Sequence, residues 1–387
     1  MIFSLSNICD YVKGKIDVAL LDDNTYISTE NMLPNKVGVT KAATLPTVLQ
    51  TQSFCAGDVL VSNIRPYFKK IWFAEFDGGC SNDVLVFRAK NGVNSRFLYY
   101  VLADDAFFNY SMATSKGTKM PRGDKIAIMK YSVPNFGHKE QEKIAGILTA
   151  IDLKIIINNK INDNLLQQAR TLYQAWFVDY TPFNGVRPSD WIDDTIDGLA
   201  KEIICGKTPS TKVSEYYGND IPFITIPDMH GNTYAVTTER YLSLYGAQSQ
   251  PKKTLPRNSI CVSCIGTAGL VTLTAQESQT NQQINSIIPK EGYSPYYIYL
   301  LMETLSVIIN NLGQSGSTIV NLNKAQFGKI AVVIPSIKIM KSFDEIVSPM
   351  FESILSKQEE NIKLAELRDS LLPRLMSGEL DVSELDI

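Results

Sequence analysis

The stretch HKEQEKIAGILTAIDLKIIINNKINDNLLQQARTLYQAWFV, residues 138–178, decides the fold of this 387-residue chain. Along it, one set of mostly apolar residues recurs at alternating steps of four and three, the spacing that keeps one stripe of a helix against a partner helix. Two asparagines interrupt the stripe near its centre. The residues of this seam are Ile144, Leu148, Ile151, Ile155, Asn158, Asn162, Leu165, Ala169, Leu172 and Trp176. We therefore predict one long helix that packs against a second helix.

Residues 338–378, KIMKSFDEIVSPMFESILSKQEENIKLAELRDSLLPRLMSG, repeat this pattern 199 positions later. The matching seam is Phe343, Val347, Met350, Ile354, Lys357, Asn361, Leu364, Arg368, Leu371 and Leu375. Neither helix can bury its stripe alone, so we predict that the two pair within the chain. An antiparallel pair would bring Asn158 and Asn162 opposite Lys357 and Asn361, a polar layer that fixes register. The alternative is two ordinary amphipathic helices, each covering its own domain.

Similarity between the two halves extends beyond the helices. Residues 58–64 (DVLVSNI) resemble residues 259–265 (SICVSCI), and residues 97–102 (FLYYVL) resemble residues 297–302 (YIYLLM), at offsets of 199 to 201 throughout. In each copy, short β-branched and aromatic runs alternate with turns rich in Gly, Pro and Asn, which is typical of a mixed α/β domain.

The predicted fold class is therefore α+β: two mixed α/β domains separated by two long helices that form an intramolecular antiparallel coiled coil, with a pseudo-twofold internal repeat. The predicted boundaries are residues 1–137 for the first domain, 138–178 for the first helix, 179–337 for the second domain, 338–378 for the second helix and 379–387 for an acidic tail.

Composition limits the class of protein. None of the apolar stretches approaches the ~20 residues that cross a bilayer, the N-terminus lacks a signal-peptide pattern, and six scattered cysteines do not suggest a disulfide framework. We expect no membrane association and a location in the cytoplasm. The net charge is −3, but residues 1–137 hold 15 basic and 12 acidic residues. Nucleic-acid binding is thus permitted by charge, although it is not demanded.

Several motifs suggest chemistry but lack its context. Gly206-Lys207-Thr208 ends like a phosphate-binding loop, but Lys201 stands where that loop needs a glycine and Pro209 follows where a helix should run. Cys261 and Cys264 have CxxC spacing without a second pair, which favours strand packing over a zinc site. Asp152-Leu153-Lys154 resembles a fragment of a nuclease site but lies in the predicted helix. We predict neither a catalytic site nor a metal site.

Several runs resemble the specificity subunits of type I restriction-modification enzymes. In the second half these are residues 205–212 (CGKTPSTK), 215–224 (EYYGNDIPFI), 281–289 (NQQINSIIP) and 367–380 (LRDSLLPRLMSGEL). The first half matches through Asn82-Asp83, Gly117-Thr118 and the helix over residues 142–176. It has Gly14-Lys15-Ile16-Asp17 in place of the Gly-Lys-Thr-Pro-Ser opening, which suggests a different half-site rather than a different function.

This resemblance covers the whole chain and implies a non-catalytic DNA-specificity subunit. Two target-recognition domains would each read one half of a bipartite target in double-stranded DNA, with the helical pair as a ruler. Two modification (methyltransferase) subunits would dock on the helices, and restriction (helicase-nuclease) subunits would join the full complex. S-adenosylmethionine, ATP and magnesium would be bound by those partners, and no cofactor by this chain.

Candidate DNA-binding residues are the Lys, Arg, Asn, Gln, Ser and Thr side chains that cluster in predicted loops, because these groups contact phosphates and base edges. In the first domain they are Arg65, Lys69, Lys70, Ser115, Lys116, Thr118, Lys119, Arg122 and Lys125. In the second domain they are Lys207, Thr208, Ser210, Thr211, Lys212, Lys252, Lys253, Thr267, Asn281, Gln282, Gln283, Gln314, Ser315, Ser317 and Thr318.

Two other functions stay open from the sequence. A coiled-coil scaffold that binds proteins rather than DNA would pair its helices between molecules and would be indifferent to the charge of these loops. A stand-alone nuclease or methyltransferase would show activity as the purified chain alone, and no motif in the sequence supports it.

Overall fold

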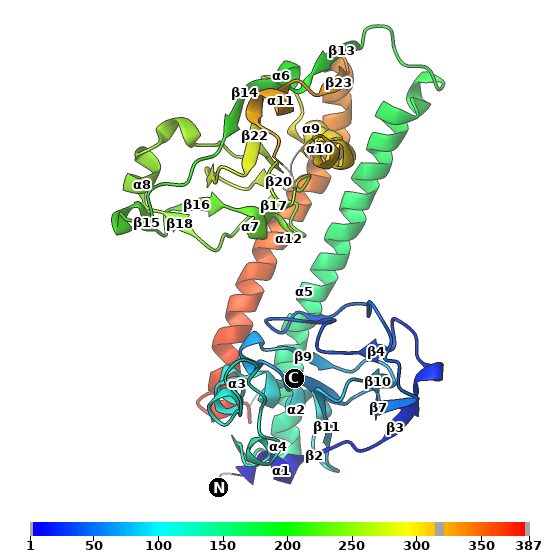
Figure 1. Ribbon diagram of the computed structural model, residues 1–387, viewed down its shortest axis with the longest axis vertical. Coiled ribbons are helices and arrows are strands. Elements are labelled where there is room, and N and C mark those ends of the chain that lie inside the picture. Colours follow the sequence, from blue (N-terminus) through cyan, green and yellow to red (C-terminus); the bar gives the residue numbers. More distant parts are fainter. Residues whose placement is uncertain (1–2, 314–320, 384–387) are drawn as a thin grey trace. The chain divides into compact units, whose positions relative to one another are not determined.

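The computed structural model describes residues 3–313 and 321–383. The chain forms two compact units, of which the first comprises Met1–Ile155 with Lys363–Ile387 and the second comprises Ile156–Ile362. Two long helices, α5 (His138–Tyr173) and α12 (Ile337–Ser377), each contribute one part to the first unit and one part to the second (Figure 1).

Two four-stranded sheets build the first unit. The main sheet has the order β2-β11-β8-β9 and is antiparallel throughout, and the second has the order β3-β7-β10-β4 with β10 and β4 parallel. The central strands β8 and β11 are apolar runs, as expected of strands that are covered on both faces. The strands are β2 (Cys9–Tyr11), β3 (Lys15–Asp17), β4 (Tyr26–Ile27), β7 (Gln50–Phe54), β8 (Val59–Ser62), β9 (Ile71–Phe73), β10 (Gly78–Cys80) and β11 (Val84–Ala89).

Two consecutive helices, α2 (Ser95–Ala103) and α3 (Asp105–Ala113), pack against the main sheet of the first unit. Asn94 caps α2 by accepting a hydrogen bond from the Phe97 backbone N–H. Asp104 ends α2 and caps α3 by accepting one from the Ala106 N–H. This single residue sets the turn between the two helices.

The C-terminal part of α12 completes the core of the first unit. Leu372, Leu375, Met376 and Val382 are each at most 7% exposed, and they share one apolar cluster with the strands and helices of residues 5–148. Lys143 of α5 also donates a hydrogen bond to the Ser383 carbonyl oxygen (2.6 Å). The first unit is therefore built from both ends of the chain.

The second unit has a five-stranded sheet of order β14-β22-β19-β20-β17 and a four-stranded sheet of order β15-β18-β16-β21. All pairs are antiparallel except β17 with β20 and β16 with β21. The strands are β14 (Ala200–Cys205), β15 (Tyr217–Gly218), β16 (Ile221–Ile224), β17 (Tyr234–Ala235), β18 (Tyr241–Leu242), β19 (Ile260–Ser263), β20 (Val271–Thr274), β21 (Gln279–Thr280) and β22 (Ile284–Pro289). As predicted, Cys261 lies inside a strand and is fully buried.

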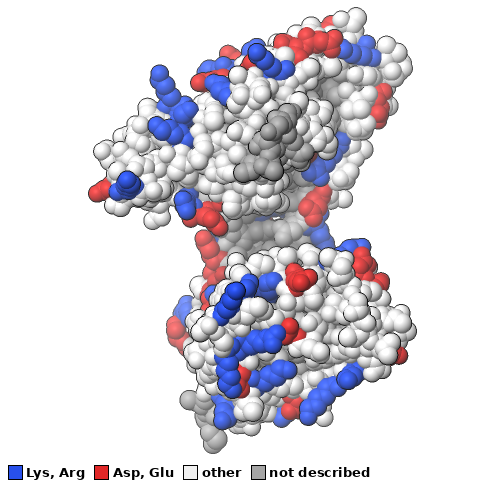
Figure 2. All heavy atoms as spheres, in the orientation of Figure 1, with Lys and Arg blue, Asp and Glu red and all other residues white. Residues whose placement is uncertain are grey.

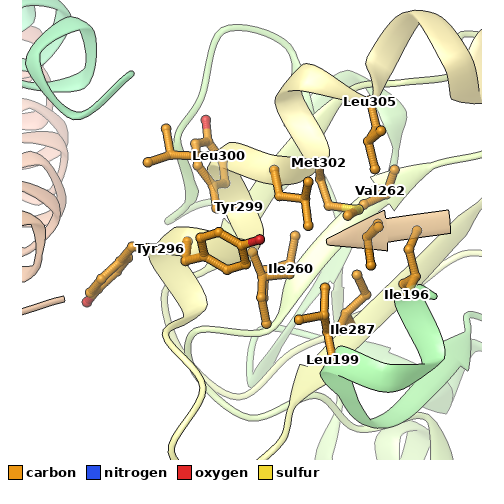
Figure 3. Packing of buried hydrophobic residues seen from close by; sticks show 14 of the residues in the cluster. Ile196, Leu199, Ile260, Val262, Ile287, Tyr296, Tyr299, Leu300, Met302 and Leu305 are labelled. Carbon is orange, nitrogen blue, oxygen red and sulfur yellow. The ribbon is translucent and has the colours of Figure 1, made fainter. Parts of the chain in front are cut away.

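The core of the second unit forms where α9 (Pro295–Thr304) packs on the main sheet. Figure 3 shows Met302 of this helix near Val262 of β19, whereas Leu300 lies beside Tyr299. Ser294 caps α9 by accepting from the Tyr297 N–H, so the helix starts immediately after the loop that follows β22.

The two units repeat one order of elements. In each, a short helix precedes the first strand of the main sheet, two helices follow its last strand, and a further short helix and strand lead into a long helix. The four strands β2-β11-β8-β9 correspond to β14-β22-β19-β20. The paired helices are α1 (Leu5–Ile8) with α6 (Ile196–Leu199), α2 with α9, α3 with α10 (Ser306–Gly313) and α4 (Lys125–Ile128) with α11 (Lys324–Gly328). The predicted mixed α/β architecture with two domains is confirmed.

Within the second unit, α5 meets α12 through its central asparagine. Asn158 is fully buried, and its Nδ2 donates to Glu360 Oε2 (2.8 Å) and to Asn361 Oδ1 (2.9 Å). We predict Lys357 and Asn361 opposite Asn158 and Asn162; Asn361 is a partner of Asn158, but Glu360 takes the place of Lys357. An ammonium offers no acceptor to the Asn158 amide, whereas the side chains one turn further along do.

Within the first unit, the contact between α5 and α12 is ionic. Asp152 Oδ1 accepts from Arg368 Nη1 (2.9 Å), and its Oδ2 accepts from the Tyr100 hydroxyl of α2 (2.7 Å). Asp152 thus joins α5 to α12 and to the domain helix, which explains the acidic residue that resembled part of a nuclease site. Among the helices in the described ranges, none has both the length and the apolar character to span a membrane.

Candidate nucleic-acid interface

In the first unit, the predicted basic residues lie on loops that the backbone ties together. The loop after β8 meets the loop after α3, because the Arg65 N–H donates to the Pro121 carbonyl oxygen (2.8 Å) and Ile64 and Lys116 each form a β-bridge with Arg122. Two candidate segments that are more than 40 residues apart in sequence therefore form one surface. We call this surface, residues 63–70 with residues 114–124, the first loop surface.

A third segment, which sequence reasoning missed, joins the first loop surface. The Asn35 N–H donates to the Phe68 carbonyl oxygen (2.8 Å), and the Lys36 N–H donates to that of Lys69 (3.0 Å). Lys36 thereby adds a cation beside Lys69. No sequence signal connects residues 35–36 with residues 68–69, because the link consists of backbone hydrogen bonds.

Three long basic residues of this surface have left-handed backbones. The φ angles are 64° at Lys36, 51° at Arg65 and 50° at Lys69. This conformation costs a non-glycine residue about 1 kcal/mol and persists only where the surroundings enforce it. Here the hydrogen bonds to Pro121, Phe68 and Lys69 enforce it, so the backbone fixes the direction in which each of these side chains leaves its loop.

Three cations of the first loop surface, and the adjacent Lys36, have anionic partners. Asp105 forms ion pairs with Lys36 (2.8 Å) and Lys69 (2.7 Å), Asp124 with Lys116 (2.6 Å), and Asp83 with Arg122 (3.0 Å). Burial raises the pKa of Asp105, but the hydrogen bonds from the two lysines outweigh it and the net shift is downward. The hydrogen bond from Lys116, with backbone N–H groups of Ala127 and Ile126, lowers the pKa of Asp124 to about 2. The carboxylates of Asp105 and Asp124 therefore stay charged at neutral pH, where they attract these lysines.

Some of the other candidates in the first unit have exposed side chains, and others have side chains that bond to the backbone. Thr118, Lys119 and Lys125 are exposed. Ser115 donates its hydroxyl to the Met112 carbonyl oxygen, and Lys70 donates its ammonium to that of Thr29 (both 2.7 Å).

Two aromatic residues, also missed from the sequence, stand between the basic ones. Tyr67 is 49% and Phe68 is 37% exposed, and their ring centroids are 4.6 Å apart. The run Arg65-Pro66-Tyr67-Phe68-Lys69-Lys70 interleaves aromatic and basic residues, which is a signal that could have found them.

In the second unit, two of the candidate segments meet. Thr208 donates its hydroxyl to Gln282 Oε1 (2.7 Å), and the Lys207 N–H donates to the Thr280 carbonyl oxygen (2.9 Å). A Cβ at Gly206 would overlap the carbonyl oxygen of Asn281, so glycine is required for this approach. The role of Gly206-Lys207-Thr208 is therefore to join this segment to residues 280–282, which is not the role of a phosphate-binding loop.

In the Asn281–Gln283 turn, some of the side-chain hydrogen bonds are made within the turn itself. Asn281 is 9% exposed; its Nδ2 donates to Gln283 Oε1 and its Oδ1 accepts from the Gln283 N–H (both 3.0 Å). Gln282 is exposed, as is Thr267 on the loop after β19. In this turn the exposed amide of Gln282, rather than that of Asn281, is available to a ligand.

The remaining candidates of the second unit are less constrained. Lys207, Ser210, Thr211, Lys212 and Lys252 are exposed, and Lys253 donates its ammonium to the Cys205 carbonyl oxygen (2.8 Å). Gln314, Ser315, Ser317 and Thr318 lie outside the described residues. In the view of Figure 2, each unit shows basic side chains on its surface, with acidic side chains among them.

Comparison with known proteins gives two matches to one family model. The model of the type I restriction modification DNA specificity domain matches residues 1–167 and residues 188–365. The chain is 31% identical to the type I restriction enzyme HindI specificity subunit of Haemophilus influenzae, over 98% of this chain and 99% of that one. It is 25% identical to the MjaIX specificity subunit of Methanocaldococcus jannaschii, over 76% and 71% of the two chains.

A solved structure has a similar fold. The S subunit of a type I restriction-modification system from M. genitalium superposes with a TM-score of 0.61 at 15% sequence identity, over 97% of this chain and 96% of that one.

Proposed function

The chain belongs to the specificity subunits of type I restriction-modification enzymes, and from this premise we propose that its two domains each read one half of a bipartite target in double-stranded DNA. The subunit is a DNA-recognition subunit and not a catalytic one. The observation that carries the proposal is that the DNA-specificity model matches the two halves of the chain separately. Each half also holds a loop surface of basic and amide side chains.

The residues of these surfaces divide into two proposed roles. Exposed lysines such as Lys119, Lys212 and Lys252 suit contacts with phosphates, which set the register of a protein on DNA without reading sequence. Contacts with base edges need fixed geometry. Thr208 and Gln282, which bond to each other, and Arg65, whose backbone is fixed, suit such contacts. The other candidates named from the sequence stay candidates for the same interface.

The long helices are proposed to act as a ruler. We infer that α5 and α12 form an intramolecular antiparallel coiled coil with pseudo-twofold symmetry, because the units repeat one order of elements and Asn158 bonds to Asn361. At ~1.5 Å per residue, helices of 36 and 41 residues are about 54 and 62 Å long. All the predicted seam residues are buried or half-buried. A rod of this length would separate two half-sites by a fixed number of base pairs.

The proposed partners are two modification subunits that dock on the helices and the restriction subunits of the full enzyme. S-adenosylmethionine, ATP and magnesium would be bound by those partners. The proposed location is the cytoplasm, where the enzyme meets DNA. Specific affinity would fall with added salt, because basic residues displace counterions from the phosphates.

The ruler is tested by inserting one heptad at the centre of α5 and one at the centre of α12. Each heptad adds about 10.5 Å, which corresponds to about three base pairs. We expect the complete modification complex to methylate targets whose half-sites are about three base pairs further apart, measured on plasmids with spacers of graded length. A heptad in only one helix is the control and should abolish methylation, because the seams no longer match. An unchanged spacing preference in the double insertion would refute the ruler.

The scaffold alternative is not favoured by the family match. It predicts that reversing the charge of Lys119 and Lys212 leaves DNA binding unchanged. A specificity subunit should instead lose affinity for all duplexes with these changes.

A further inference from the structure

We propose that Arg65 is the residue of the first domain that reads a guanine, through a guanidinium held in advance of binding. This assignment rests on the proposed function and goes further, because it separates one base-reading residue from its phosphate-binding neighbours. It follows from the backbone at Arg65, from the partners of the surrounding cations and from the chemistry of base edges.

The backbone fixes the direction in which the Arg65 side chain leaves the loop. Its φ of 51° is left-handed, its N–H donates to the Pro121 carbonyl oxygen (2.8 Å), and its own carbonyl oxygen accepts from the Phe68 N–H (3.0 Å). The rigid 3₁₀ turn Pro66–Phe68 follows immediately. A strained conformation that is held by bonds on both sides is typical of a functional position.

The charge of Arg65 is not neutralised within the described residues. Lys36, Lys69, Lys116 and Arg122 each bind a carboxylate, and Lys70 binds a carbonyl oxygen. No carboxylate or carbonyl oxygen of the described chain accepts a hydrogen bond from the Arg65 guanidinium, and its Nε is buried without a partner. Two residues earlier, Asn63 Oδ1 is also buried without a partner. Folded proteins pair nearly all buried polar atoms, so the unpaired Arg65 Nε and Asn63 Oδ1 could form hydrogen bonds with a ligand.

Guanidinium chemistry identifies the base. Arginine presents a planar fork of N–H donors, and in the major groove guanine offers two adjacent acceptors, O6 and N7, that match this fork. A phosphate contact needs only a flexible cation, and exposed Lys119 on the same surface supplies one. Arg65 is partly buried, and two hydrogen bonds fix its backbone, which suits a site that tests geometry.

The test uses the complete modification complex and duplex targets that are varied one base pair at a time. We expect wild type to require a guanine at one position of one half-site. Arg65→Gln and Arg65→Lys should lower discrimination at that position roughly 10- to 100-fold, because a bidentate contact is lost. Preference at the other half-site should be unchanged, which also shows that the variants are folded. The matched control, Lys119→Ala, should weaken binding to all sequences and lower the slope of log K against log salt concentration by about one.

Three results would count against the assignment. If Arg65→Gln keeps the base preference and weakens all targets equally, or if Arg65→Lys behaves as wild type, Arg65 contacts a phosphate. A wild-type complex without any sequence preference would overturn the proposed function together with this assignment. Either of the two results with Arg65 variants would overturn the assignment of Arg65 and leave the proposed function intact.

Discussion

Backbone strain at Arg65 links stability to recognition. The residue adopts a left-handed conformation that an arginine enters only at a cost, and its neighbours Lys36 and Lys69 do the same. Strain of this kind is retained in proteins where it positions a functional group. A residue that enters the left-handed region without strain should therefore make the protein more stable at this position, and the difference should be measurable.

We predict that Arg65→Gly is more stable than Arg65→Ala by about 1 kcal/mol, because glycine enters the left-handed region freely and alanine does not. Both variants lose the guanidinium, so the comparison isolates the backbone. Urea denaturation of the two variants measures the difference. As a matched control, Arg96 lies in α2, where glycine should instead be less stable than alanine by about 1 kcal/mol. Equal stability of the two Arg65 variants would show that the backbone strain is absent in solution.

The long helices show what periodicity predicts and where it stops. The four-three spacing marked the seam residues of α5, and these residues are buried or half-buried. The same spacing put Asn361 in the layer opposite Asn158, but it could not show that Glu360 rather than Lys357 is the second partner, because rotamers and register decide which side chain lies within reach. Spacing alone also gave no warning that Arg368, a seam position, would bind Asp152.

Loops resist prediction for a different reason. The basic residues of the first loop surface were found from composition, but their roles stay predictions. Lys36 joins Lys69 through backbone bonds and through Asp105, which is 69 residues away in the chain. Such contacts depend on the path of the backbone in three dimensions, which residue types do not encode locally.

Hydrogen bonds of Asn158, as well as apolar packing, help to set the register between α5 and α12. Its Nδ2 is bonded, but its Oδ1 and that of Asn162 are buried and have no partner among residues 3–313 and 321–383. We predict that Asn158→Leu raises the free energy of unfolding by about 1 kcal/mol, because an unpaired polar atom is replaced by apolar packing. Glu360 and Asn361 are half-buried and can bond to water instead. Urea denaturation tests the stability.

The same substitution should relax register. In the modification complex, Asn158→Leu is expected to methylate targets with non-native spacers that wild type ignores, measured on the graded-spacer plasmids. Ile155→Leu, an apolar exchange on the same seam, is the control and should keep the native spacing. If Asn158→Leu is less stable than wild type, the bonds to Glu360 and Asn361 outweigh the cost of the unpaired oxygen.

The C-terminal part of α12 and the residues that follow it complete the core of the first unit. Leu372, Leu375, Met376 and Val382 are buried among side chains from residues 5–148. Full burial of one such side chain contributes about 1.5–3 kcal/mol. Four together are comparable with the total stability of a domain, about 5–15 kcal/mol. Residues 1–155 therefore should not keep their native packing until residues 363–383 have joined them.

We predict that a chain ending at residue 362 loses the native structure of the first unit and keeps that of the second, whose segment Ile156–Ile362 stays intact. Hydrogen exchange should show loss of protection in β8 and β11 of the first unit and native protection in β19 and β22 of the second. A chain ending at residue 383 is the matched control and should exchange as wild type does. Because the missing contacts are non-covalent, a separate peptide of residues 363–383 should restore protection at β8 and β11. Native protection of these strands in the shortened chain without the peptide would mean that the first unit folds independently of α12.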